Sequence, residues 1–181
     1  SLREAKASIY AGKVKIDGVV RKSLHHAIGL MDVIELENVS DIYRLVPTEG
    51  KILKPIKINE SEKSKKLVRV VTKTSINKET TQTGFHDGRS TLAEVKAGVG
   101  DTCVMQIPDQ KILDIIKLEA GCQGLVVRGI NAGQIGKVES VEKGTFILPK
   151  RVILILGDKK IEIPADIIMP IGKEEPVIQL K

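Results

Sequence analysis

The chain has 181 residues, of which 41 % are hydrophobic, enough to bury the core of one large domain or of two or three small ones. Aromatic residues make up 2 % and Trp is absent, so we expect cores of Ile, Val and Leu and no platform for stacking nucleobases. No apolar run approaches the roughly 20 residues of a membrane-spanning helix, and no signal segment opens the chain. These features predict a soluble cytoplasmic protein without a membrane partner.

The net charge of +6 suggests an anionic partner, and its distribution is uneven. Residues 1–22 hold six basic and two acidic side chains, and residues 43–96 hold twelve and six. Residues 97–181 balance at eleven and eleven. The two basic regions indicate either an electrostatic footprint on part of the surface or an ordinary lysine-rich surface.

Cys103 and Cys122 stand far apart in the sequence and have no metal-ligand spacing. We expect both to be small buried side chains in a reducing compartment. His25 and His26 have no third ligand nearby, so no metal site is predicted.

Residues 2–36 predict a helix, a turn, a strand, a turn and a final strand. Leu2, Ala5 and Ile9 share one helical face, and Gly12 is placed to end the helix in a left-handed cap. "KVKI" alternates as a strand, "DG" predicts a tight turn, and "DVIEL" predicts the last strand. One short helix is too little to cover these strands, so a packing partner is expected elsewhere.

Further along, β-prone runs predict strands at residues 42–46, 51–58 and 67–73, with a short helix capped by Asn59 or Ser61 between the last two. The stretch from Thr74 to "HDGRS" is polar, "GVGDTCVMQIP" resumes the strand pattern, and a helix or turn is expected at residues 109–117. After Leu118, the segments "GTFILP", "RVILIL", "IEIP" and "PVIQL" predict a small antiparallel barrel or sandwich with "GDKK" as a hairpin.

The stretch "LVVRGINAGQIGKVESVE" places three glycines between two β-prone runs. It lacks the Gly-Lys-Ser/Thr of a Walker loop and the spacing of GxGxxG, and a strand follows it where both nucleotide motifs require a helix. It resembles the KOW motif, a strand-loop-strand whose basic and amide side chains face nucleic acid or a protein. A plain hairpin bend is the alternative.

The first segment is similar to the αL RNA-binding motif, which has a basic helix, then V-x-I/V-D/N-G-x-V-R, then G-x-x-D-x-I. With "YRLVPTEGK", "FHDGRSTL", "KILDIIKLEAG" and "GINAGQIGKV", the whole chain resembles small-subunit ribosomal protein four of the archaeal and eukaryotic type. Relative to that family, we expect the N-terminal extension and a preceding helix to be absent. Ser90 also stands where the family usually has Asn.

The resemblance implies a mainly β, multi-domain fold, with an α+β N-terminal unit and a C-terminal SH3-like KOW β-barrel. Its domains would be residues 1–40 (αL), 41–117 (central, β-rich) and 118–181 (KOW barrel with C-terminal strands). It implies partners in small-subunit rRNA and neighbouring ribosomal proteins, with no cofactor, metal or small-molecule substrate. The expected RNA-binding residues are Arg3, Lys6, Lys13, Lys15, Arg21, Lys22, His86, Arg89, Arg128, Asn131, Gln134 and Lys137.

"FHDGRS" contains residue types found in hydrolytic sites, but neighbours on one turn do not converge as a catalytic triad. We therefore predict a structural turn or an RNA-contacting turn, and no catalytic residues. Two alternatives to a ribosomal protein remain: an RNA-modifying enzyme that captures RNA through an αL domain, and a KOW-type transcription factor. The second does not account for the αL segment.

Overall fold

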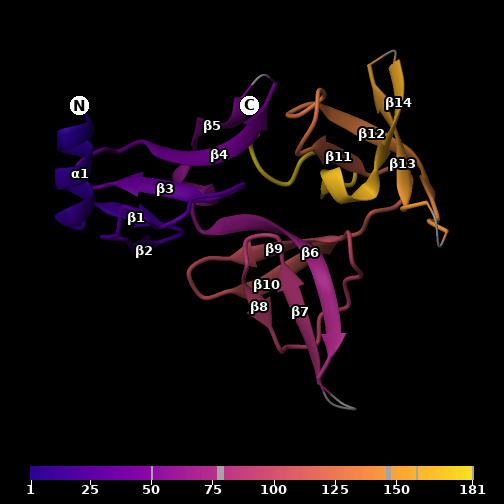
Figure 1. The fold of residues 1–181 in the computed structure, drawn as a ribbon, viewed down its shortest axis with the longest axis horizontal. Coiled ribbons are helices and arrows are strands. Elements are labelled where there is room, and N and C mark those ends of the chain that lie inside the picture. The colour runs from indigo at the N-terminus through magenta and orange to yellow at the C-terminus, as the bar shows by residue number, and fades with distance from the viewer. Residues whose placement is uncertain (50, 77–79, 146–147, 158, 181) are drawn as a thin grey trace.

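The computed structural model describes residues 1–49, 51–76, 80–145, 148–157 and 159–180. One short helix precedes three five-stranded antiparallel sheets (Figure 1), which confirms the predicted mainly β fold. The first sheet follows α1 (Leu2–Tyr10) and contains β1 (Val14–Ile16), β2 (Val19–Val20), β3 (Val33–Leu36), β4 (Ile42–Thr48) and β5 (Lys51–Ile58).

The second sheet begins after a 3-10 turn, η1 (Glu60–Glu62). It contains β6 (Lys65–Ser75), β7 (Thr81–Phe85), β8 (Ser90–Thr91), β9 (Thr102–Gln106) and β10 (Lys111–Ile116). The third sheet contains β11 (Gln123–Val126), β12 (Ile135–Glu142), β13 (Arg151–Leu156), β14 (Lys159–Pro164) and, after η2 (Ala165–Ile167), β15 (Ile168–Gly172). The strand orders are β2-β1-β3-β4-β5, β10-β9-β6-β7-β8 and β14-β13-β12-β11-β15.

Local sequence explains the start of the chain. Ser1 and Glu4 form a reciprocal capping box on α1, and Gly12 takes a φ of 76° just beyond the last turn, as predicted. Asp17 and Gly18 both have positive φ, the conformation of a tight turn that suits the twist of flanking antiparallel strands, and join β1 to β2.

Three local predictions are wrong. Residues 111–116 form β10 beside β9, where a helix or turn was expected, because the hairpin partner supplies the hydrogen bonds. "PVIQL" at residues 176–180 forms no strand and runs as a tail. The described residues of "GTFILP" are not part of a strand, although Thr145 N–H donates to the carbonyl of Leu148; residues 146 and 147 lie outside the described residues.

The polar stretch after Thr74 also contains a strand that the sequence pattern did not indicate, β7, which pairs with the extended end of β6. The hairpin predicted at "GDKK" is present as β13 and β14, although residue 158 itself lies outside the described residues.

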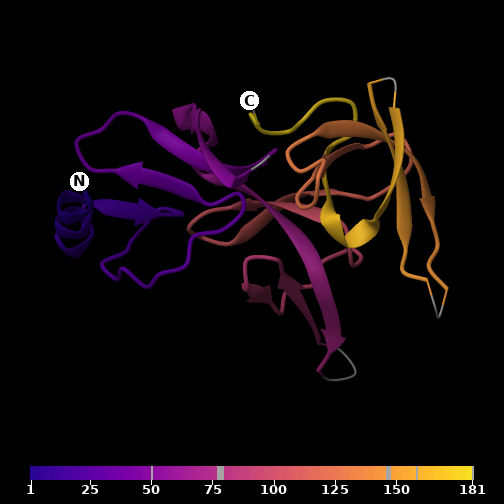
Figure 2. The ribbon, with the colours of Figure 1, turned by 45° about the horizontal axis from the view of Figure 1, so that its top comes forward.

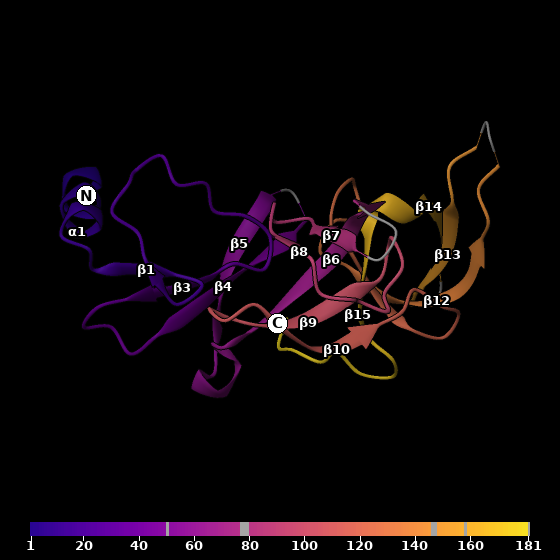
Figure 3. The same ribbon diagram turned by 90° about the horizontal axis from the view of Figure 1, so that it is seen from below.

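The predicted boundary at residue 40 falls inside the first sheet, because β3 pairs with β4. The boundary at residues 117–118 falls between the second and third sheets. Figures 2 and 3 show α1 and the third sheet at opposite ends of the molecule, with the second sheet between them.

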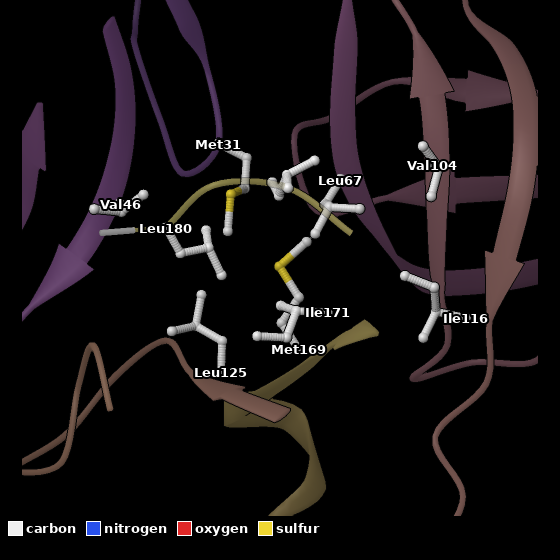
Figure 4. Close-up of a cluster of buried hydrophobic side chains, with 10 residues drawn as sticks. Met31, Val46, Leu67, Val104, Ile116, Leu125, Met169, Ile171 and Leu180 are labelled. Carbon is white, nitrogen blue, oxygen red and sulfur yellow. The ribbon is translucent and has the colours of Figure 1, made fainter. Parts of the chain in front are cut away.

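Each sheet has an apolar cluster of its own, and a further cluster joins all three. Figure 4 shows side chains converging from the three sheets and from the C-terminal tail. The buried members of this central core are Met31, Val46, Leu67, Val104, Ile116, Leu125, Met169, Ile171, Ile178 and Leu180. The three sheets therefore pack as one body. No helix in the described part of the chain is long and apolar enough to cross a bilayer.

Candidate RNA interface

The basic side chains at the N-terminal end are exposed. They lie on α1, around β1 and after β2, and α1 has no buried residue. Among the described residues these side chains form no ion pair. The group, called the N-terminal basic face below, consists of Arg3, Lys6, Lys13, Lys15 and Lys22.

Arg21 differs from its neighbours on that face. Its side chain is half-buried, and its Nε is buried without a hydrogen-bond partner among the described residues. Arg21 lines a hollow between the first and second sheets, where Arg89 also lies. The structure therefore brings Arg21 and Arg89 together, although they are far apart in the sequence.

The glycine-rich loop at residues 127–134 joins β11 to β12, as the strand-loop-strand prediction requires. Gly129 and Gly133 have φ values of 92° and 84°. A Cβ atom on Gly133 would lie 2.6 Å from the carbonyl oxygen of Pro47 and 2.8 Å from Cα of Thr48. The loop thus lies directly against β4 of the first sheet, and only glycine permits this approach.

The four predicted residues of this region do not form a single cluster at the loop tip. Arg128 is exposed, and its charge lies close enough to Arg69 to contribute to a lowered Arg69 pKa, after the larger effect of burial. Asn131 and Gln134 are half-buried. Lys137 lies beyond the loop on β12 and lines a hollow with other charged groups.

His86 is held inside the structure. Its Nδ1 accepts a hydrogen bond from the N–H of Arg69 at 3.0 Å, and its Nε2 lies 3.3 Å from the carbonyl oxygen of Leu30. This arrangement requires a neutral ring with its proton on Nε2. Burial lowers the pKa of His86, which agrees with a neutral ring, and His86 therefore links the second sheet to the segment before β3.

A buried cluster of charges joins the same two sheets. Lys66 is 1 % exposed, and its Nζ lies 2.8 Å from Asp17 Oδ2, 2.5 Å from Asp32 Oδ1 and 3.1 Å from Asp87 Oδ2. Arg89 Nη2 donates to Asp17 Oδ2 at 2.6 Å. We call these five residues the Lys66 cluster.

The cluster shifts the pKa values of its members in opposite directions. Burial by itself lowers the pKa of Lys66, but the charges of Asp17 and Asp32 outweigh it and the pKa is raised. Burial by itself raises the pKa of Asp87, but Lys66 and the N–H of Arg89 outweigh it and the pKa is lowered. Both groups are therefore held in their charged forms.

Sequence reasoning did not identify Lys66, Asp17 or Asp32 as members of one cluster. "KKLVRVV" was assigned a strand, but Lys66, Leu67 and Val68 are buried in succession, because the second sheet is covered on both faces here. The usable signal was the repetition of isolated Asp residues in "IDG", "LMD" and "HDG" opposite a lysine within an apolar run.

The three carboxylates do not form a metal site, because the Lys66 ammonium occupies the position between them. Nowhere in the described ranges does a group of three His, Cys, Asp or Glu side chains suit a metal ion. Both cysteines are buried and unbridged, and burial raises the pKa of Cys103 to about 11. Its thiol is therefore poorly suited to act as a nucleophile.

Two arginines also join the sheets, one between the first and second sheets and one between the second and third. Arg44 is fully buried on β4, and its guanidinium binds Glu62 Oε2 at 2.9 Å and the carbonyl oxygens of Glu62 and Lys65. Arg69 on β6 donates to the carbonyl oxygens of Asp166 and Ile168 in the third sheet. The three sheets are thus held together by the buried Arg44 and the half-buried Arg69 as well as by the apolar core.

The chain is similar to a known family of proteins in both sequence and structure. Residues 39–112 match the model of ribosomal family S4e. The chain is 39 % identical to small ribosomal subunit protein eS4 of Staphylothermus marinus, over 98 % of this chain and 75 % of that protein. It is 36 % identical to eS4 of Methanothermobacter thermautotrophicus, over 98 % and 74 %.

The crystal structure of 30S ribosomal protein S4e from Thermoplasma acidophilum superposes on this fold with a TM-score of 0.83. The match has 28 % sequence identity and covers 94 % of this chain and 86 % of that one. The sequence matches to the eS4 proteins and the shared three-sheet architecture lead to one conclusion: the chain belongs to the S4e family of small-subunit ribosomal proteins.

Proposed function

We propose that this protein binds small-subunit rRNA as a structural component of the cytoplasmic ribosome, and that the N-terminal basic face makes the primary contact. The observation that carries this assignment is the set of five exposed cations within the first 22 residues that form no ion pair with the described residues. Cations that are not neutralised by neighbouring carboxylates are available to displace counterions from RNA phosphates. The protein is not an enzyme.

The loop at residues 127–134 supplies a second contact. Arg128 is exposed there, and the side chain of Ile130 is 91 % exposed. We assign the exposed guanidinium of Arg128 a second contact with rRNA phosphate, beside the primary contact of the N-terminal basic face.

The test compares salt dependence of rRNA binding between matched variants. Each phosphate contact contributes about 0.7 to 0.9 to the slope of log affinity against log salt concentration. The triple substitution Arg3→Gln, Lys6→Gln and Lys15→Gln should therefore lower the magnitude of the slope by about 2 to 3. The control substitution Lys159→Gln, at an exposed position on the third sheet, should leave the slope unchanged. Equal slopes for the triple variant and the control would refute the assignment.

A further inference from the structure

The hollow between the first and second sheets has a volume of about 440 Å³. It is called the junction hollow below. Its walls come from the β1–β2 turn, the segment before β3, the start of β6 and the turn between β7 and β8. The charged or titratable side chains that face it include the whole Lys66 cluster and also Arg21, His26 and His86.

Each carboxylate oxygen of the junction hollow contacts an N–H group or a cation. The two oxygens of Asp17 receive the N–H of Val33 and the cations of the cluster, within 3.0 Å. Asp32 receives the N–H of Gly29 at 2.7 Å and Lys66 at 2.5 Å. Asp87 Oδ1 receives the N–H of Arg89 at 3.1 Å. Asp87 Oδ2 accepts no hydrogen bond from the described residues, but it lies in ion-pair contact with Lys66 Nζ at 3.1 Å and Arg89 Nε at 3.5 Å.

The donors are not all occupied. Arg21 makes no side-chain hydrogen bond within the described part of the chain, and its Nε is buried. Arg89 Nη1 is also buried and without a partner there, although Nη2 of the same group is bound to Asp17. The half-buried ring of His26 has no hydrogen bond to the described residues.

The carboxylates are more deeply buried than the side chains that carry unused donors. The side chains of Asp17 and Asp87 are 3 % and 8 % exposed, whereas that of Arg89 is 23 % exposed and those of Arg21 and His26 are half-buried. The side chains that carry unused donors are thus the outer ones, and the carboxylates, whose oxygens all contact an N–H group or a cation, are the inner ones. The three carboxylates are matched in number by Lys66, Arg89 and Arg21, so an added anion meets no net negative charge.

We propose that the junction hollow binds a phosphate group, held by Arg21, Arg89 and His26. An RNA backbone phosphate offers only acceptors, which complements a site whose carboxylate oxygens already contact N–H groups or cations and whose donors are not all used. That the bound phosphate belongs to the rRNA backbone rests on the proposed function. That the site binds a phosphate group rests only on the side chains that line it. The Lys66 cluster acts as a positioning device, because it fixes Arg89 and the β1–β2 turn that precedes Arg21.

The experiment follows the side-chain Nε–H signals of Arg21 and Arg89 by NMR in the full chain. Inorganic phosphate is added against chloride at equal ionic strength. We expect saturating shifts of both signals with phosphate, and at least about a tenfold loss of phosphate affinity in Arg21→Met, because a charge-assisted hydrogen bond is removed. The matched control is Lys159→Met, since Lys159 is exposed, does not line the hollow and lies outside the N-terminal basic face.

A second arm adds a small-subunit rRNA fragment. If the fragment shifts the same signals and abolishes the response to inorganic phosphate, the bound group is an RNA phosphate. If inorganic phosphate binds but the bound fragment leaves the signals unchanged, the site takes free phosphate and the RNA source is wrong. Non-saturating shifts, or equal phosphate affinity in Arg21→Met, His26→Ala and Lys159→Met, would overturn the site even if rRNA binding through the N-terminal basic face holds.

Discussion

Single buried ionic residues hold the first and second sheets together. Lys66 lies between three carboxylates that reach it from two turns and one strand entry, and all of them depend on its charge. A buried ionic cluster adds little to the free energy of unfolding relative to an apolar core of the same volume. Removing Lys66 alone is costly, because it leaves the buried carboxylates without a compensating positive charge.

We therefore predict that Lys66→Met lowers the free energy of unfolding by about 3 to 5 kcal/mol, measured by urea denaturation. The matched control is Lys65→Met, because Lys65 is adjacent on β6 and exposed. It should change the free energy by no more than about 0.5 kcal/mol. Similar losses in both variants would show that the cluster does not stabilise the junction.

His86 makes stability depend on pH. Its pKa is lowered in the folded protein, so the unfolded chain binds more protons between the lowered value and about 6.5. Stability should fall as the pH is lowered from about 7.5 to about 5.5, a window in which the lowered pKa of Asp87 has little influence. Unfolding measured at both pH values should show a smaller fall for His86→Gln than for the wild type.

The exposed His25 provides the control for this pH effect. His25→Gln should retain the fall seen in the wild type. An undiminished fall in His86→Gln would mean that another group carries the pH dependence.

At the scale of elements, the loop at residues 127–134 and the C-terminal tail connect the third sheet to the first. The loop touches β4 through Gly133, and the tail places Ile178 and Leu180 in the central core. The C-terminus lies between the first and third sheets in Figures 1 and 2. Neither connection depends on strand pairing.

Two glycines of the loop allow the cost of a positive φ to be measured separately from the cost of a clash with β4. Gly129 and Gly133 both have positive φ, but a Cβ on Gly129 meets nothing within 4 Å. Gly129→Ala should cost about 1 to 2 kcal/mol of unfolding free energy from backbone strain alone. Gly133→Ala should cost more, and should increase amide hydrogen exchange in β4. Equal costs without a change in exchange would contradict the contact between loop and sheet.

The tail offers a comparable pair of neighbours. Ile178 is 3 % exposed in the central core, whereas Val177 is 45 % exposed. Ile178→Ala should lower the unfolding free energy by about 2 to 5 kcal/mol. Val177→Ala should change it by no more than about 0.5 kcal/mol. If calorimetry finds the two variants equally stable, the tail is not part of the core.

At the scale of the whole molecule, local sequence patterns predicted the strands better than their assembly. The turns at Gly12 and Asp17–Gly18 follow from backbone chemistry, and the β-prone runs from side-chain type. The "PVIQL" tail was misassigned because an apolar run has the same pattern whether it pairs as a strand or packs as a tail.

At the candidate site the local pattern decided less. The helical period predicted an apolar face on α1, but no residue of that helix is buried and Leu2 is 83 % exposed. The partnership of Arg89 with Asp17 joins residues 72 apart in the chain. No local pattern encodes which of several polar turns will meet across a sheet junction. The roles of His86 and Arg89 in joining the first and second sheets therefore required the three-dimensional structure.

The most direct test of the central claim is a titration of the wild-type protein with small-subunit rRNA fragments and with an unrelated duplex of equal length, at two salt concentrations. We predict tighter binding to particular rRNA fragments, with an affinity that falls steeply as salt increases. Equal and weak binding to the rRNA fragments and the duplex at both salt concentrations would contradict the assignment of this protein as an rRNA-binding component of the small subunit.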